Sequence, residues 1–149
     1  MKLIKDDRMK HMHGVAEFMF EHAEDYGLQP ERMYILGLLH DVGYMISDEQ
    51  HELCGSSYLD LLGYIDSDFI RSHGLTPTEY MNFHRCMKDE IPKEMILLWE
   101  ADLSIDIGGK QVDMLERLDG IKKRRGDKVY NKAFETYQFI TKYKLENKL

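Results

Sequence analysis

The sequence has little of what characterises secreted, membrane-spanning or β-rich proteins. Only two of its 149 residues are cysteine, and Cys54 and Cys86 do not form a CxxC pair, so we expect free thiols in a reducing compartment. The longest apolar runs are far shorter than the ~20 residues of a membrane span, and no apolar segment of signal-peptide length follows Met1. These absences predict a cytoplasmic protein that does not associate with membranes.

The chain also has fewer basic than acidic residues. The chain has 27 acidic and 20 basic residues, which gives a net charge of −7. Nucleic-acid binding relies on cationic neutralisation of phosphates, so this balance argues against a nucleic-acid partner. A small anionic substrate is compatible with it, because a bound metal can supply positive charge locally. The one basic cluster, Lys122-Lys123-Arg124-Arg125, is interpreted either as a solvated helix C-terminus that complements the helix dipole or as a rim that holds phosphate.

Strand-type alternation is scarce, whereas signals for helices fill the chain. Apolar residues at helical spacing, with glycine stops and proline starts, predict helices at about 7–26, 30–43, 51–62, 66–73, 77–87, 93–105, 111–125 and 128–144. The clearest start is Thr76-Pro77-Thr78-Glu79, which combines a capping threonine, a first-turn proline and a capping-box glutamate. We therefore predict an all-α protein, a single domain over residues 1–149 with about seven or eight helices.

The stretch Leu38-Leu39-His40-Asp41-Val42-Gly43 places two ionisable side chains at the end of an apolar helix. A buried ionisable pair is costly unless a metal or a salt bridge compensates it. We therefore interpret His40 and Asp41 as metal ligands. Two other histidines also stand at predicted helix ends, since His51 begins a helix and His73 precedes a helix-stopping glycine. Helix ends that converge on one pocket would give these residues a common site.

Three segments, taken in order, resemble the HD-domain metal-dependent phosphohydrolase superfamily. They are residues 8–16 with His11, residues 38–43 with the His40-Asp41 pair, and residues 99–102 with Asp102. This order is similar to the family's pattern of a histidine, a later His-Asp pair and a later aspartate. The resemblance covers about residues 8–107 and implies a helical HD-domain bundle, with the predicted helices at 111–144 following it.

Two further segments, residues 51–56 with His51 and residues 69–73 with His73, resemble a two-metal subset of this superfamily, which includes bacterial hydrolases that split symmetrical diadenosine tetraphosphate. By this similarity Asp41 would be the catalytic residue that bridges two ions. Glu52 and Asp48 flank the expected metal pocket and could orient a ligand imidazole. The implied partners of the first ion are His11, His40 and Asp102, and those of the second ion are His51 and His73. The chain departs from the subset at Tyr44, where the subset has a lysine.

Imidazole and carboxylate ligands suit divalent transition metals. Iron is our first choice, with Mn, Zn, Ni or Co as alternatives, and one or two ions fit the pattern. A bound ion lowers the pKa of its water toward ~7, so hydroxide forms at neutral pH. We therefore predict an enzyme that cleaves a phosphoester or phosphoanhydride of a small metabolite, with a nucleotide as the expected substrate. Candidate substrate-binding residues in the segment after His73 are His84, Arg85 and Lys88.

Two other functions stay open at this point. Some relatives with this ligand set are di-iron oxygenases, which use mixed-valence iron on oxygen rather than on phosphate. The small size of the chain is also compatible with a non-catalytic module that binds a metal or a nucleotide. A homodimer is a further hypothesis that the sequence leaves open.

Overall fold

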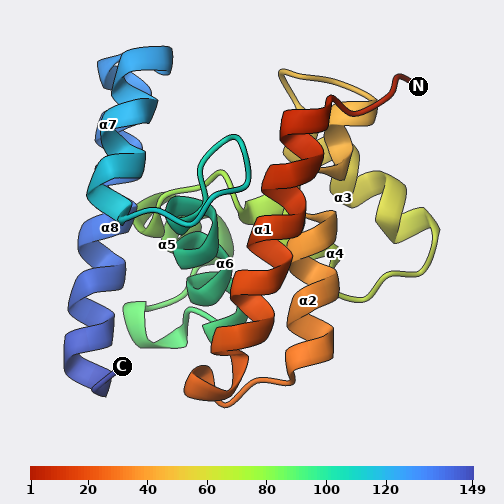
Figure 1. Cartoon of the computed structure of the whole chain (residues 1–149). Coiled ribbons are helices and arrows are strands. Elements are labelled where there is room, and N and C mark those ends of the chain that lie inside the picture. Colours follow the sequence, from red (N-terminus) through yellow and green to blue (C-terminus); the bar gives the residue numbers. More distant parts are fainter.

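The computed structural model describes all 149 residues and is built from helices (Figure 1). The only β-type pairing is an isolated bridge between Ile105 and Gln111, so the predicted all-α class and number of helices are confirmed. None of the helices combines the length and apolar character that a membrane span needs. The helices are α1 (Asp6–His22), α2 (Pro30–Leu39), α3 (His51–Leu61), α4 (Ser67–Ser72), α5 (Pro77–His84), α6 (Lys93–Ser104), α7 (Met114–Arg125) and α8 (Asp127–Asn147), and short 3₁₀ turns cover Ala23–Tyr26, Val42–Met45 and Lys88–Glu90.

Helix α6 lies at the centre of the molecule. Between Met95 and Ser104 every residue except Asp102 is buried, as expected for a helix that is apolar on nearly all sides. Helices α1 and α2 pack on one side of α6, and the α7–α8 hairpin packs on the other (Figure 1). Asp102 is therefore held near the C-terminal end of a rigid core helix, between these two halves of the molecule.

Helices α1 and α2 approach each other closely because Gly37 has no side chain. A Cβ atom at this position would lie 2.8 Å from the Cα of Ala16, so only glycine permits the observed distance between the two backbones. The contact brings the C-terminal end of α2 against the middle of α1. The rings of His11 and His40 consequently lie edge to face, with their centroids 5.3 Å apart.

Several predicted helix boundaries are wrong by a few residues. Helix α2 ends at Leu39 rather than near Gly43, because the His40 amide bonds back to the carbonyl of Gly37 and a 3₁₀ turn follows. Helix α7 begins at Met114 rather than at Gln111, because the Asp113 side chain caps it by accepting from the Leu115 amide. The Thr76–Glu79 capping box of α5 is present as predicted.

A buried polar cluster ties the C-terminal helix to the core. Glu100 of α6 is 3% exposed and accepts a hydrogen bond of 2.6 Å from the Tyr26 hydroxyl, while Lys144 of α8 forms an ion pair with its other oxygen. Burial and the neighbouring Glu100 carboxylate together raise the pKa of Tyr26. The phenol thus remains a hydrogen-bond donor at neutral pH, and the carboxylate has a partner on each oxygen.

Replacing Tyr26 with phenylalanine is expected to lower the free energy of unfolding by about 1–3 kcal/mol, because a buried carboxylate oxygen loses its donor. Urea unfolding followed by circular dichroism measures this difference. The matched control is Tyr34→Phe, on a partly exposed face of α2, which is expected to change stability by less than about 0.5 kcal/mol. Equal effects of the two substitutions would show that the buried bond contributes nothing specific.

Candidate metal centre

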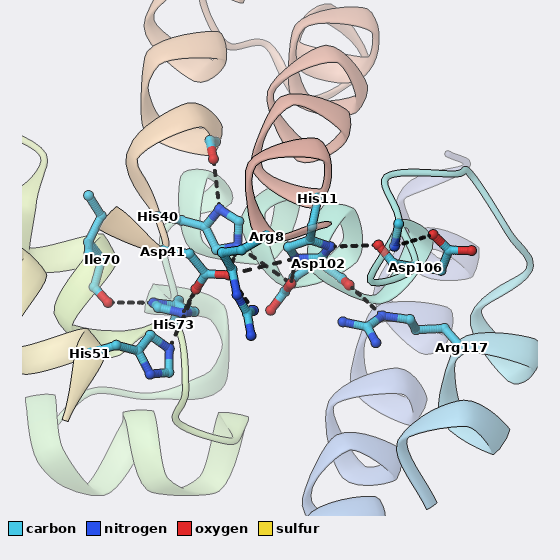
Figure 2. A network of polar contacts seen from close by, with 12 residues as sticks. Arg8, His11, His40, Asp41, His51, Ile70, His73, Asp102, Asp106 and Arg117 are labelled. Carbon is cyan, nitrogen blue, oxygen red and sulfur yellow. Dashed lines mark hydrogen bonds and ion pairs between the residues drawn. The ribbon is translucent and has the colours of Figure 1, made fainter. Parts of the chain in front are cut away.

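The structure brings together all six side chains that the sequence suggests as metal ligands (Figure 2). Five different helices contribute to this ligand cluster. It consists of His11 from α1, His40 and Asp41 at the end of α2, His51 at the start of α3, His73 at the end of α4, and Asp102 from α6.

Asp41 lies at the middle of the ligand cluster and is 3% exposed. Its Oδ2 atom is 3.2 Å from Nε2 of His40 and 3.9 Å from Nε2 of His11. Its Oδ1 atom is 3.4 Å from Nε2 of His51 and 3.3 Å from Nε2 of His73. The two oxygens of one carboxylate therefore face two different pairs of imidazoles.

Asp102 belongs to only one side of this arrangement. Its Oδ1 atom is 2.8 Å from Nε2 of His11 and 3.6 Å from Nε2 of His40. On the other side, Glu52 places an oxygen 3.4 Å from Nδ1 of His51, and its carboxylate is close enough to His51 and His73 to share a metal with them. Each half of the ligand cluster thus has two imidazoles and access to a carboxylate besides Asp41.

Main-chain carbonyl groups orient three of the imidazoles. A carbonyl only accepts hydrogen bonds, so each of these rings carries its proton on Nδ1 and presents Nε2 to the carboxylates. The Nδ1 donors and their acceptors are His11 to Asp106 at 2.9 Å, His40 to Gly37 at 2.7 Å, and His73 to Ile70 at 2.6 Å. Figure 2 shows these bonds at the back of each ring, pointing away from Asp41.

The chemistry of the donor set fits a divalent transition metal. Nε2 of His40 is buried and has no hydrogen-bond partner, although carboxylate oxygens of Asp41 and Asp102 lie 3.2 and 3.6 Å away. A neutral imidazole nitrogen and a carboxylate oxygen are both acceptors, so they face each other favourably only when a proton or a metal ion lies between them. Mixed nitrogen and oxygen ligands of this kind suit Fe, Mn, Zn, Ni and Co.

The electrostatics of the ligand cluster likewise favour a positive charge. Burial lowers the pKa of His40, but the carboxylates of Asp41 and Asp102 outweigh it and raise this pKa to about 10. Burial also acts to raise the pKa of Asp41, yet the imidazoles of His40 and His73 hold it well below its usual value. The carboxylates therefore stay ionised and attract either protons or a metal ion to the imidazoles.

The ligand cluster forms one side of a cavity of about 390 Å³. Asp41, His51, His73 and Asp102 line it, whereas His11 and His40 lie behind them. Basic side chains line the rest of the cavity, one from α1 and the others from the α7–α8 hairpin. These are Arg8, Arg117, Arg124, Arg125 and Lys132. Sequence reasoning assigned none of them individually, although the unusual basic run at 122–125 was a signal for two of them.

The three residues suggested for substrate binding do not line this cavity. His84 contacts the Ser72 hydroxyl at 3.1 Å, and Lys88 lies 3.9 Å from Glu146 of α8. Arg85 ends α5 in a left-handed backbone conformation, with φ of 52°, which turns the following segment toward α8. They follow His73 closely in the chain, and His84 contacts Ser72, the residue before His73, but none of the three lines the cavity.

A comparison with known protein families matches the HD domain over residues 8–104, well over half of the chain. The chain belongs to the HD domain family. Comparisons with curated proteins and with solved structures gave no match. Members of the HD domain family are generally metal-dependent hydrolases, which agrees with the ligand cluster of this HD domain. The matched region ends with α6, so α7 and α8 lie outside it.

Proposed function

We propose that this HD domain is a phosphohydrolase of the two-metal kind, similar to the diadenosine tetraphosphate hydrolase branch. The observation that carries the proposal is the position of the Asp41 carboxylate. Its two oxygens face separate pairs of imidazoles, at distances of 3.2–3.9 Å from their Nε2 atoms. A carboxylate in this position would be shared by two ions. His11, His40 and Asp102 would hold one ion, and His51, His73 and the nearby Glu52 would hold the other.

The reaction proposed is cleavage of a phosphoester or phosphoanhydride of a small metabolite, with a nucleotide as the expected substrate. Two bound ions would supply an activated water and would polarise the phosphoryl oxygens. The protein's own contribution begins with Arg8, which donates to Asp41 Oδ2 at 3.0 Å and stacks on the Tyr44 ring at 3.9 Å. Its planar guanidinium lines the cavity, where it can hold a non-bridging phosphate oxygen.

Tyr44 is a positioning residue in this proposal. Its ring lies between the Arg8 guanidinium and the His51 imidazole, with 4.1 Å between the Tyr44 and His51 centroids. The stack fixes the orientation of the expected metal ligand His51 together with that of Arg8, the group proposed to bind phosphate. The concentration of arginines around the cavity also favours a phosphorylated substrate over dioxygen, the substrate of the oxygenase alternative.

The test of the proposed function is hydrolysis by protein loaded with Fe²⁺ or Mn²⁺ and freed of excess metal. Phosphomonoesters, nucleotides and dinucleoside polyphosphates are assayed by phosphate release and chromatography, while elemental analysis and anomalous scattering count the ions. We expect two ions per chain and turnover of at least one of these substrates. A loaded protein that cleaves none of them would refute the proposal.

Replacing His51 with alanine is expected to reduce the metal content from two ions per chain to one, because the first set of ligands remains intact. The activity should fall together with the second ion, since both ions act on the same phosphoryl group. The control is His84→Ala, which removes a partly buried histidine that contacts Ser72 and lies outside the cavity. Retention of both ions by the His51 variant, or loss of one by the His84 variant, would contradict the assignment.

A further inference from the structure

The α7–α8 hairpin faces the ligand cluster across the cavity. Arg117, Arg124 and Arg125 of α7 and Lys132 of α8 contribute to this side, which we call the arginine wall. Figure 2 shows Arg117 extending from α7 toward Asp102, on the side opposite His51 and His73, and its Nε atom donates to the Asp102 carbonyl at 3.2 Å. The HD domain match ends at residue 104, so the arginine wall lies outside the matched region.

The basic run at the end of α7 is divided between two environments. Lys122 and Lys123 point to the surface, where their ammonium groups lie 4.0 Å from Asp127 and 2.9 Å from Asp119. Arg124 and Arg125 are also exposed, but they line the cavity, and neither forms an ion pair with a carboxylate. A helix C-terminus that only complemented its dipole would not require this division.

Positive charges are crowded in the arginine wall. The pKa of Arg124 is lowered by burial and by the nearby guanidinium groups of Arg117, Arg125 and Arg8. Like charges held together in this way repel each other unless an anion lies among them. Guanidinium groups match phosphate oxygens in geometry and bind them through paired, charge-assisted hydrogen bonds. Trp99 of α6 also lines the cavity; it is buried, and its indole N–H has no hydrogen-bond partner.

We propose that the arginine wall binds a second phosphoryl group of the substrate, separate from the one that reacts at the metal ligands. The ligand of the complete cavity then carries at least two linked phosphoryl groups, which a phosphomonoester lacks. This inference rests on the proposed function for the reacting group, whereas the anion-binding property of the wall can be measured without turnover. Arg8, beside Asp41, lies between the two positions and can contact the phosphates that join them.

The test is isothermal titration calorimetry on the metal-loaded full-length protein. Inorganic tripolyphosphate is the extended probe and orthophosphate is the short one, and the tripolyphosphate is first saturated with Mg²⁺ so that it does not extract the bound ions. In the double variant Arg124→Gln/Arg125→Gln, tripolyphosphate affinity is expected to fall by roughly 10–100-fold, because two charge-assisted contacts are lost. Orthophosphate affinity is expected to stay within about twofold, since it binds at the metal ligands.

The matched control is Lys122→Gln/Lys123→Gln, which removes the same charge from the same helix on its outer face. It is expected to change neither affinity by more than about twofold, because these lysines lie outside the cavity and are paired with Asp127 and Asp119. A third variant, Arg124→Lys/Arg125→Lys, keeps the charge but loses the forked donors, so an intermediate loss is expected. Circular dichroism shows whether each variant is folded. If the glutamine variant does not fold, the lysine variant takes its place in the test.

Three results would overturn the inference. The Arg124/Arg125 variants could lose affinity equally for both probes, the Lys122→Gln/Lys123→Gln control could lose as much tripolyphosphate affinity as they do, or the wild type could show no preference for tripolyphosphate over orthophosphate. If the protein hydrolyses no phosphate compound, the proposed function fails. The calorimetry still decides whether the arginine wall binds extended polyphosphates, so the two failures are distinguishable.

Discussion

Replacing Asp41 with asparagine is expected to lower the proposed phosphohydrolase activity by roughly 10³-fold or more, beyond the effect of removing one hydrogen-bond donor from a preorganised site. Asparagine has nearly the same size as aspartate but no anionic oxygens, so it cannot serve two ions at once. Asp41 is also the common neighbour of His11, His40, His51 and His73. Metal content should therefore fall below two ions per chain, measured by elemental analysis alongside steady-state kinetics.

The chain offers a matched control for this substitution. Asp66 is also buried and also paired with an arginine, since Arg32 donates to both of its oxygens at 2.8 and 2.9 Å. Asp66→Asn is expected to cost about 1–3 kcal/mol of stability, the value of a hydrogen bond to a charged group, without loss of metal. If both variants, at a temperature where both are folded, lost activity and metal equally, the specific role of Asp41 in metal binding would be contradicted.

Replacing Gly43 with alanine is expected to lower the free energy of unfolding by about 3 kcal/mol or more, at the upper end of the cost of overpacking a core. A Cβ atom at Gly43 would overlap the carbonyl oxygen of His51 and lie 2.7 Å from the amide nitrogen of Gly55. Both of these groups belong to the backbone of α3, which cannot give way as a side chain can. For a chain of this length, thermal unfolding should shift downward by about 6–12 °C.

The same substitution should weaken metal binding, because α3 carries His51 and must move as a unit. Gly108→Ala is the control, since a Cβ atom there would meet only the Asp106 side chain, at 3.5 Å. Differential scanning calorimetry with and without bound metal separates the two effects. A Gly43 variant that unfolds at the wild-type temperature would show that the close contact between residue 43 and α3 is not required.

The ligand cluster could be predicted from the sequence because each member belongs to a short segment with its own pattern. His40 and Asp41 stand out as ionisable residues at the end of an apolar helix, and His51 and His73 mark helix ends. The end of α2 was harder to predict. Nothing in the order of residues 38–43 indicates that His40 leaves the helix, because that depends on Gly43 packing against α3.

The arginine wall could not be predicted in the same way. Arg117 and Arg124 approach Asp102 and Arg8 only after the α7–α8 hairpin has packed against α6, and no local pattern encodes that packing. The basic run at 122–125 left two interpretations open. In the structure its lysines pair with surface carboxylates, whereas its arginines line the cavity. His84, Arg85 and Lys88, the residues suggested for substrate binding, follow the ligands closely in the chain but do not line the cavity.

The carbonyl groups behind His11, His40 and His73 bear on how this site can change during evolution. Every amino-acid type provides a carbonyl, so the tautomer of each imidazole is encoded by the path of the backbone and not by a neighbouring side chain. At position 70, for example, Ile70 can be exchanged for other core residues while its carbonyl keeps its place behind His73. Sequence drift around the ligands therefore leaves the orientation of the rings intact, and relatives of this chain should share that orientation even where the residues at these positions differ.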